Sequence, residues 1–599
     1  MYEIATSAAV IGVAASFYIR SGSALEIEAP GLFLIGFFLW SALSISWSQV
    51  PYVSLTELGS LAAGLATYLI WRLCNQQIPV LPTTTLMVAL GWALATAMLA
   101  QALAGFEPDA MFLNRNSAAA FVNLLWPMAA VGWLCSARPT GYRLLLLAGA
   151  GLMILAVSLT GSRGALVGSV AGLAMLAGAA IFVTRRWREP LILVLLGGAM
   201  IALPNVLTEG TAASGISSLS DPGSAGASRF LIWEAAWTMV LEHPWLGWGP
   251  GVFFMAYPAF RLPAEGSAGF FVHNDYLQFW LERGLPGFVL VLALGLAICW
   301  LFGRYLRNTR SNETTHATDG TAIAIFSALS TLGVHSFFSY SLQLMPFLAV
   351  LGILIAEFER TTGAGLRVRL SVPRIRGRIL GIVALAGLTL LPIWAVTTHA
   401  LYFREVGRGI DHFTAEDYSR AAESFSRARA LWKAPDTAWY LQANTHLMAL
   451  RHNDNVPENL RRDLVKRAGE LLDGARQRNP LSPSTPLILG LLRANHPDLL
   501  PGSAMEALRR SLALEPRTIE ARYALSQLME RRGDTDEALT LIERGFRITY
   551  KTTANTAPLV RRYQELRHKA NSGSSSSDSN PGTTPLSPQI RSLRPRPEA

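Results

Sequence analysis

Charged residues and cysteines are both scarce in this sequence, and each shortage excludes a class of protein. Only 15% of the 599 residues are charged, whereas about a quarter of the residues in a typical soluble domain are charged. The three cysteines stand singly within or beside apolar segments, so they predict neither a disulfide framework nor a metal site. Because 51% of the residues are hydrophobic, the composition predicts a polytopic membrane protein with room for a second, soluble domain.

The common signatures of metal- and nucleotide-dependent enzymes are absent from the first 400 residues. Zinc-ligand spacing, a Walker loop, an Asp-x-Asp pair and a G-x-G-x-x-G turn after a strand do not occur there. We therefore expect no metal and no other cofactor. The net charge of +10 reflects arginines in the loops between apolar segments, and without a nucleic-acid motif it predicts no nucleic-acid partner.

Long apolar runs fill the first 400 residues. A helix that spans the membrane needs ~20 mostly apolar residues. We expect the first run to be retained as a membrane helix, because it lacks a basic start and ends at Arg20 without a small-residue cleavage site. The twelve predicted spans are residues 3–19, 31–47, 58–73, 84–104, 117–136, 144–160, 165–183, 191–207, 285–303, 320–337, 343–358 and 379–398.

Arginines are distributed unequally among the loops between these spans. Alternate loops carry arginine clusters, as at residues 185–188, 304–310 and 360–378. The opposite loops hold only Arg115, Arg163, Arg229, Arg261 and Arg283. Positive residues are retained on the cytoplasmic side of a membrane, so twelve spans with this alternation put both termini outside. We then expect the long loop 208–284 and everything after residue 400 on the extracytoplasmic face.

The loop 208–284 contains segments of different character. Residues 208–228 are small and polar, and predict a mobile segment. Apolar and aromatic residues then recur at helical spacing over 230–241, which predicts an amphipathic helix on the membrane surface. His243-Pro244 is expected to end this helix, because the residue before a proline disfavours helix. The glycines of 247–251 predict a turn at the membrane interface.

The end of this loop carries the most distinctive pattern in the chain, FFVHNDYLQFWLERGLPGF at residues 270–288. It contains His273 and Asn274 side by side, then nine residues, then a Gly-x-x-Gly that begins at Gly284 before a membrane-length apolar run. The pattern places an imidazole at the start of a membrane helix. An imidazole can accept a proton near neutral pH. The alternative is an ordinary loop at the start of a helix, with a chance histidine.

Three arginines on the expected outer face are candidate ligands for phosphate. Arg163 lies among small residues in LTGSRGALVGS, Arg229 precedes the amphipathic helix, and Arg261 follows the aromatic turn in YPAFRLP. A guanidinium fork recognises phosphate, although an arginine at a lipid interface can also extend to the headgroups. Arginines that flank His273 would disfavour its cationic form and leave a neutral base.

Four polar side chains are weaker candidates for substrate binding. Asn114 and Asn116 open the fifth span, where they can cap the helix or bind sugar hydroxyls. Asn274 can orient a ligand but cannot accept a proton at neutral pH. His335 ends the tenth span beside a short outer turn, and a buried structural histidine is the equal alternative there.

The last third of the chain changes to amphipathic helices with an internal repeat. The segments that begin at Ala504 and Ala538 are 34 residues apart, which is the period of a tetratricopeptide repeat (TPR). Because such hairpins stack to bury their apolar faces, we expect a TPR-like helical solenoid over residues 401–570, able to present a protein partner. Residues 571–599, rich in serine and proline, predict a disordered tail.

Taken in order along the chain, these motifs resemble those of the O-antigen ligase superfamily, which includes O-antigen polymerases and bacterial protein O-oligosaccharyltransferases. The resemblance covers residues 30–360 and not the repeat domain. Relatives often have an acidic residue after the tenth span, where this chain has Ser339-Tyr340. The matching pieces are FLNRN at 112–116, SRGA at 162–165, SRFLIWEAAW at 228–237, HPWLGWGPGVF at 243–253, HN at 273–274 with GLPG nine residues later, and HSFFSYSLQLMP at 335–346.

The resemblance implies an all-α enzyme of the bacterial inner membrane, with residues 1–400 as its transmembrane glycan-transferase domain. It implies transfer of a glycan from undecaprenyl pyrophosphate to an acceptor hydroxyl in the periplasm, without metal or nucleotide. His273 would assist the acceptor, and Arg163 and Arg229 would hold the pyrophosphate.

Several functions stay open at the level of sequence. Ligation to lipid A–core or another surface acceptor, polymerisation of repeat units and transfer to protein all fit the resemblance. A polysaccharide transporter or flippase and a membrane-anchored scaffold belong to other classes. The notable charges lie at the outer ends of the spans, whereas transporters place them in mid-helix, which favours the enzyme.

Overall fold

The computed structural model describes residues 25–74, 83–112, 114–135, 138–207, 225–267, 269–311, 320–363, 368–370, 376–453, 455–549 and 557–572. Nearly all of the regular structure in these residues is helical, as the all-α prediction required. The first predicted span, residues 208–224 of the predicted mobile segment, and the tail after residue 572 lie outside the described residues.

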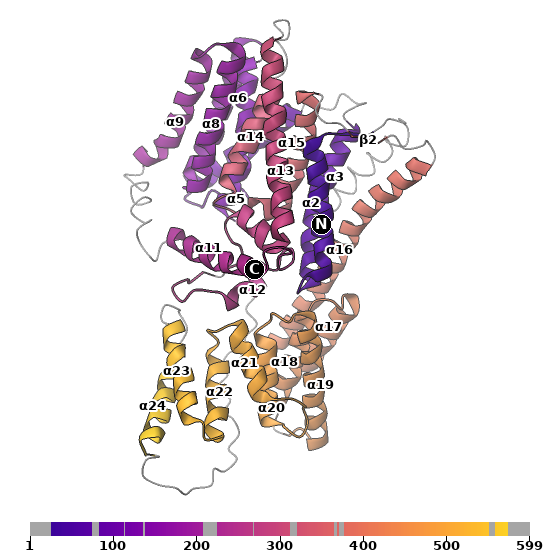
Figure 1. Ribbon diagram of the computed structural model, residues 1–599, viewed down its shortest axis with the longest axis vertical. Coiled ribbons are helices and arrows are strands. Elements are labelled where there is room, and N and C mark those ends of the chain that lie inside the picture. Colours follow the sequence, from indigo (N-terminus) through magenta and orange to yellow (C-terminus); the bar gives the residue numbers. More distant parts are fainter. Residues whose placement is uncertain are drawn as a thin grey trace. The chain divides into compact units, whose positions relative to one another are not determined.

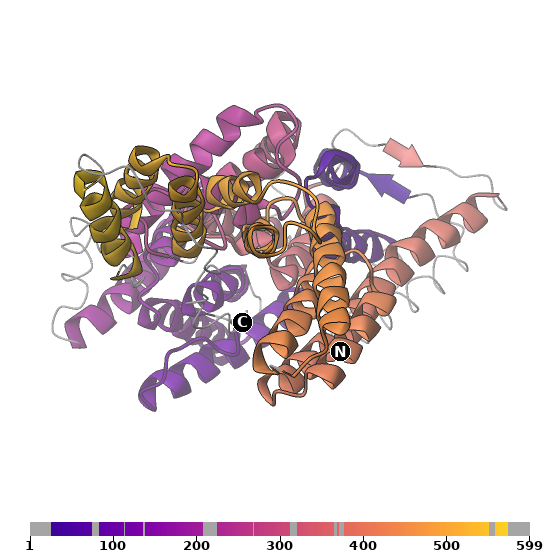
Figure 2. The same cartoon turned by 90° about the horizontal axis from the view of Figure 1, so that it is seen from below.

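The described chain folds as helices joined by short loops, with one small antiparallel pair of strands (Figures 1 and 2). Up to residue 370 the elements are β1 Leu25–Ile27, α2 Ala29–Ser44, η1 Ile45–Trp47, α3 Pro51–Cys74, α4 Thr83–Leu103, α5 Arg115–Asn123, α6 Trp126–Cys135, α7 Thr140–Leu159, α8 Arg163–Thr184, α9 Arg188–Leu207, α11 Ala225–Glu242, α12 Phe253–Ala256, η2 Tyr257–Ala259, α13 Asp275–Ser311, α14 Thr321–His335, η4 Ser341–Gln343, α15 Met345–Thr362 and β2 Val368–Leu370. The later elements are α16 Arg376–Thr414, α17 Tyr418–Leu431, α18 Thr437–His452, α19 Glu458–Arg478, α20 Ser484–Asn495, α21 Ala504–Leu514, α22 Ile519–Arg531, α23 Thr535–Thr549 and α24 Ala557–Ser572.

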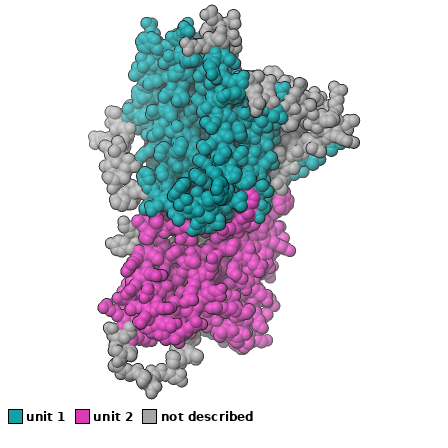
Figure 3. Space-filling view, in the orientation of Figure 1, with its two compact units in different colours: residues 1–46, 55–250, 271–393 teal, residues 47–54, 251–270, 394–599 magenta. Residues whose placement is uncertain are grey.

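The chain forms two compact units, coloured separately in Figure 3. The first unit consists of residues 1–46, 55–250 and 271–393, and the second of residues 47–54, 251–270 and 394–599. Segment 251–270 therefore belongs with the C-terminal helices, although in sequence it separates α11 from His273.

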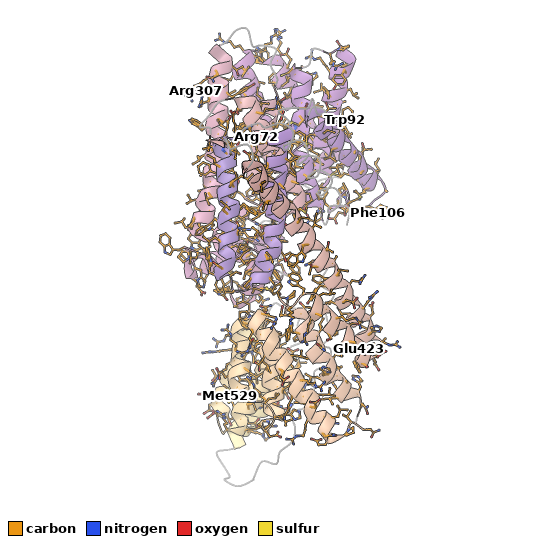
Figure 4. All side chains as sticks on the ribbon, turned by 90° about the vertical axis from the view of Figure 1, so that its right-hand side faces the viewer. Arg72, Trp92, Phe106, Arg307, Glu423 and Met529 are labelled. Atoms are coloured by element: carbon orange, nitrogen blue, oxygen red, sulfur yellow. The ribbon has the colours of Figure 1, made fainter. Side chains whose placement is uncertain are left out.

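Within the described residues, seven helices are long and apolar enough to cross a membrane, so the protein is a multi-pass membrane protein. Figure 4 shows Arg307, near the end of α13, toward the upper end of the first unit and Phe106, which follows α4, lower down. The predicted spans at 191–207, 320–337, 343–358 and 379–398 are helical as well, as α9, α14, α15 and part of α16. The seven candidate spans are Ala29–Trp47, Pro51–Arg72, Thr84–Leu103, Arg115–Cys135, Thr140–Leu159, Arg163–Thr184 and Asp275–Thr309.

Helix α8 packs tightly against α14 because three glycines share one of its faces. Gly164, Gly168 and Gly172 recur at every fourth residue, which places them in one row along the helix. A Cβ atom on Gly172 would lie 2.2 Å from Cγ2 of Thr331, and one on Gly168 would lie 2.8 Å from the Thr331 carbonyl oxygen. Small residues of this kind allow two helix backbones to approach closely in a membrane.

The buried side chain of Asn123 ties α5 to α8 and α14. Its Nδ2 donates to the Ala165 carbonyl at 2.8 Å, and its Oδ1 accepts from Ser169 Oγ at 2.7 Å and from Trp126 Nε1 at 3.1 Å. Thr331 Oγ1 of α14 donates to the Asn123 carbonyl at 3.1 Å. A buried polar network with its bonds made is rigid. The ends of these three helices, which carry three of the predicted site residues, are therefore held in register.

Helix α13 begins earlier than the sequence suggested and contains a sharp bend. The prediction placed its start at residue 285, after the Gly-x-x-Gly, but the helix starts at Asp275. Gly284 interrupts it with φ 65° and ψ −174°, a conformation that glycine adopts without steric cost. A Cβ atom on Gly284 would lie 2.1 Å from the Trp245 carbonyl oxygen, so this position has no room for a side chain.

The bend in α13 is bonded to the aromatic turn after α11, which ends at Glu242 as predicted. The Trp248 N–H donates to the Leu281 carbonyl at 3.0 Å, and the Gly249 N–H donates to the Glu282 carbonyl at 2.9 Å. The interrupted helix leaves these two carbonyls without their usual partners. The two glycine motifs that looked separate in the sequence are thus one structural unit at the start of α13.

The helices of the second unit pack in sequence order, each with its own buried apolar face. The two copies of the 34-residue repeat are α21 and α23, and α22 lies between them. Ser503 Oγ caps α21 by accepting from the Glu506 N–H at 3.2 Å, and Gly533 turns the chain with φ 90°. Leu508, Leu525 and Ile542 from the three helices meet in one core.

Arg517, in the turn between α21 and α22, bonds to segment 251–270. Arg517 Nη2 donates to the carbonyls of Leu262 and Glu265, both at 2.7 Å. The Glu265 carboxylate in turn accepts from the Tyr257 hydroxyl at 3.0 Å and pairs with Arg261 at 3.4 Å. The segment that precedes His273 in the sequence is therefore anchored immediately before α22.

Candidate functional site

The candidate site begins with α11, which lies across the lower end of the first unit's helix bundle in Figure 1. Arg229 lies near the start of this helix, and Trp233 follows one turn later on the same face. The Trp233 Nε1–H donates to the Val272 carbonyl at 3.0 Å. This bond fixes the helix that carries Arg229 against the residue that precedes His273.

His273 lies two residues before α13 with a backbone φ of 59°, in the left-handed region that few residues other than glycine adopt. Burial lowers the pKa of its imidazole, and the positive charge of Arg229 lowers the pKa further, to about 4. The sequence predicted repulsion by arginines as the cause, whereas burial is the larger of the two. At neutral pH the imidazole is therefore uncharged and able to accept a proton.

Arg229 is a half-buried cation without a counter-charge in the described part of the chain. No described carboxylate forms an ion pair with it. Burial lowers the pKa of its guanidinium, the neighbouring Arg163 adds to that effect, and Tyr340 opposes it. A desolvated guanidinium that faces a second arginine is destabilised by both effects, so an anion at this point would stabilise the site.

Three other arginines of the arginine-poor loops, Arg115, Arg261 and Arg283, differ from Arg229 because carboxylates pair with them. Arg283 is fully buried and bonds to Glu282 at 2.9 Å and Glu57 at 3.3 Å. Arg115 pairs with Glu107 at 3.3 Å at an exposed position. Arg261, which the sequence suggested as a phosphate ligand, belongs to the second compact unit and pairs with Glu265 there.

Arg163 is the first residue of α8 and is exposed to solvent. It lies close enough to Arg229 for their charges to repel. The start of a long helix carries a partial positive charge from its aligned peptide dipoles. The glycine seam and the Asn123 network hold this end of α8 in place, so the structure does bring together Arg163, Arg229 and His273.

Tyr340 is the residue of this site that the sequence did not identify as a candidate. Its ring stacks on Phe271 with centroids 4.0 Å apart and planes 4° apart. The same ring meets the His273 imidazole edge-to-face at 5.2 Å and 74°. Its hydroxyl oxygen accepts a hydrogen bond from Asn114 Nδ2 at 2.7 Å. The available signal was the Ser339-Tyr340 pair, which stands where relatives of the resembled family often carry an acidic residue.

The asparagine candidates have local structural roles. Asn114 caps α5, because its Oδ1 accepts from the Ser117 N–H at 2.9 Å. Asn274 accepts in the same way from the Leu277 N–H at 3.1 Å, at the start of α13. Asn116 lies in the first turn of α5 and is half-buried. Capping, the alternative weighed for Asn114, is thus one function of that side chain, and its bond to Tyr340 is another.

His335 ends α14, and its imidazole is buried against the start of α8. A Cβ atom on Gly164 would lie 3.2 Å from its Nδ1 atom. The histidine therefore helps to place the helix end that carries Arg163. Among the described residues, no group of three His, Cys, Asp or Glu side chains is arranged to hold a metal ion.

One model of a known protein family matches the part of the chain that carries this site. Residues 148–292 match the family model described as O-antigen ligase. The matched region runs from within α7 through the bend of α13 and contains Arg163, Arg229 and His273. A comparison with curated proteins gave no match. The resemblance inferred from the motifs is thus confirmed by this match, which supports the O-antigen ligase superfamily through residues 148–292.

Proposed function

We propose that this protein transfers a glycan from an undecaprenyl pyrophosphate carrier to an acceptor hydroxyl on the periplasmic face of the bacterial inner membrane. One observation carries the proposal: a half-buried arginine, Arg229, has no described acidic partner and lies beside an imidazole that is neutral at pH 7. An anion-binding group next to a proton acceptor is the minimum that such a transfer requires. The match of residues 148–292 to the O-antigen ligase family model supports a ligase- or polymerase-type glycosyltransferase.

The proposed reaction exchanges one bond of the anomeric carbon for another. The bond from that carbon to the carrier's phosphate oxygen breaks, and its electron pair leaves with the pyrophosphate. The acceptor oxygen forms the new bond from the opposite side, which inverts the anomeric centre. His273 takes the proton of the acceptor hydroxyl as this bond forms. The reaction balances without an external oxidant or reductant.

The arginines stabilise the leaving group in this mechanism. Negative charge grows on the pyrophosphate as the glycosidic bond breaks, and guanidinium groups already in position stabilise it without reorganisation. Arg229 is held by the Trp233–Val272 bond and Arg163 by the packing of α8 against α14. Both groups can bind phosphate oxygens through paired N–H donors, which a lysine cannot do.

Ligation of a finished glycan to a surface acceptor is the form of this reaction that we favour. Polymerisation of repeat units and transfer to protein use the same chemistry, and the C-terminal helical unit could present a protein acceptor. A transporter is less well supported, because Arg229, which has no acidic partner among the described residues, lies near the start of a helix and beside a proton acceptor rather than in mid-helix.

The lipid-linked glycan that accumulates in cells without this protein distinguishes these forms. A ligase should leave polymerised glycan on the carrier in the periplasm, because polymerisation proceeds and only the final transfer stops. A polymerase should leave single repeat units instead. Glycan retained on the cytoplasmic face would contradict both and indicate a flippase. The measurement is the chain length and sidedness of extracted lipid-linked glycan, with the wild-type gene restored as control.

The membrane orientation is a separate prediction that follows from the arginine distribution. Reporter fusions at residues 187, 308 and 370 are expected to report the cytoplasm, and fusions at 215 and 450 the outside, because positive residues are retained inside. A cytoplasmic signal at 215 would place the loop that carries Arg229 and His273 on the wrong side for a periplasmic transfer. Fusions that express the reporter at equal levels on both faces serve as the control.

A further inference from the structure

The phenol of Tyr340 has a defined hydrogen-bond role that the proposed mechanism does not use. The Asn114 side-chain oxygen is already committed, because it accepts from the Ser117 N–H at 2.9 Å. The amide must therefore present its Nδ2 donor to Tyr340, at 2.7 Å. The Tyr340 oxygen is thus the acceptor in this pair. The Ser117 side chain is a second hydrogen-bond partner, and it lowers the pKa of the phenol, as a donor to that oxygen does. With two bonds accepted, the phenol's own hydrogen remains to be donated to another group.

The protonation state of the phenol is compatible with that donation. Burial raises the pKa of Tyr340 above its ordinary value, although its bonds from Asn114 and Ser117 and the charge of Arg229 act in the opposite direction. The phenol therefore stays protonated at neutral pH. A hydroxyl that accepts one hydrogen bond becomes a stronger donor of its own, because the two bonds polarise each other.

The backbone fixes the position of Tyr340 relative to His273. The Asp275 N–H donates to the Ser336 carbonyl at 2.9 Å, and its Oδ2 accepts from the Leu342 N–H at 3.1 Å. These two bonds bracket the turn between α14 and η4 that carries Tyr340. Residues on both sides of the His273-Asn274 pair therefore hold the tyrosine in place, Phe271 by stacking and Asp275 by hydrogen bonds.

The electrostatic surroundings indicate what the phenol would bind. Arg229 and Tyr340 lie close enough to interact, and Arg229 is half-buried beside Arg163 with no carboxylate partner among the described residues. A third cation here would add to the repulsion, whereas a neutral hydroxyl supplies another donor without adding charge. Hydrogen bonds to an ionised acceptor are stronger than neutral ones, so donors of this kind suit an anionic oxygen best.

We propose that Tyr340 is a substrate-binding residue whose hydroxyl donates a hydrogen bond to a phosphate oxygen of the lipid pyrophosphate donor, beside the Arg229 guanidinium. This inference rests on the proposed function, because it assigns a residue to the donor site of that reaction. The ring positions the hydroxyl through its contacts with Phe271 and His273. Asn114 orients the hydroxyl toward the site.

The test is Tyr340→Phe in the full-length protein, which removes the hydroxyl and keeps the stacked ring. The probe is a short isoprenyl pyrophosphate, and the isoprenyl alcohol of equal length is measured beside it. We expect binding of the pyrophosphate to weaken ~10–100-fold, as for the loss of one hydrogen bond to a charged group. Binding of the alcohol should not change. In transfer assays the KM for the lipid-linked donor should rise.

Tyr276→Phe is the matched control, because Tyr276 donates to the Gly333 carbonyl at 2.8 Å and is not stacked on His273. It should bind both probes as the wild type does. Wild-type binding of the pyrophosphate by Tyr340→Phe, or equal weakening for pyrophosphate and alcohol, would overturn the inference. Arg229→Ala separates the two proposals: if it also binds pyrophosphate normally, the proposed donor site itself is wrong.

Discussion

Replacing His273 with alanine is expected to slow glycan transfer by ~10²–10⁴-fold while binding of the lipid-linked donor changes little. The imidazole is uncharged at neutral pH, because burial and Arg229 lower its pKa to about 4. An uncharged group contributes little to binding a polyanion but is ready to accept the proton of the acceptor hydroxyl. The measurement is transfer by purified protein, with the KM for the donor and kcat determined separately.

Two variants serve as controls for this result. His243→Ala removes an exposed histidine of the same loop, which meets Trp248 edge-to-face with ring centroids 4.5 Å apart. This variant should transfer at the wild-type rate. His273→Asn keeps a residue that tolerates the left-handed backbone at φ 59°, so it should lose activity as alanine does without added backbone strain. Wild-type rates for both His273 variants would exclude the histidine as the base.

The pH dependence gives a second readout of the same histidine. Protonation abolishes the base, so activity is lost as the pH falls through the pKa of the imidazole. For the free enzyme, kcat/KM should therefore persist below pH 6.5 and fall only as the pH approaches about 4. Bound pyrophosphate brings negative charge that favours the imidazolium, so the acid limb of kcat is expected at a higher pH. A single limb near 6.5 in both profiles would contradict a buried imidazole.

The sequence predicted those parts of the fold that depend on local pattern. Apolar length gave the membrane helices, helical spacing gave α11, and the proline after His243 marked where that helix ends. The candidates His273, Arg163 and Arg229 were recognisable because a titratable or charged group beside an apolar span is uncommon. These features are properties of single segments, which can be judged without knowledge of their neighbours.

Long-range contacts were not predictable in the same way. The association of segment 251–270 with the repeat helices depends on Arg517, about 250 residues away in the sequence. Tyr340 is an ordinary tyrosine until Asn114 and His273 are brought to it. The structural role of Arg283 was likewise not predictable, because its partner Glu57 lies 226 residues away in the sequence.

Replacing Arg229 with alanine is expected to raise the KM for the donor and to lower kcat together, by ~10²–10³ in kcat, which is typical for removal of one group that stabilises developing negative charge. The effect should exceed that of Arg163→Ala, because Arg229 is half-buried and Arg163 is exposed, and charges interact more strongly away from water. Lysine at either position should restore activity only in part, since it keeps the charge and loses the paired donors.

The stability of the arginine variants distinguishes a ligand-binding charge from a structural one. Arg229 has no described ion-pair partner, so its removal relieves a desolvated charge, and the variant should unfold at or above the wild-type temperature. Arg283→Ala should be destabilised by several kcal/mol, because it leaves Glu57 and Glu282 without their counter-charge. Arg115→Ala removes only an exposed pair with Glu107 and should retain both stability and activity.

Wild-type transfer by both Arg229→Ala and Arg163→Ala would exclude a pyrophosphate clamp. An Arg229 variant that loses activity only because it unfolds would instead make the arginine structural.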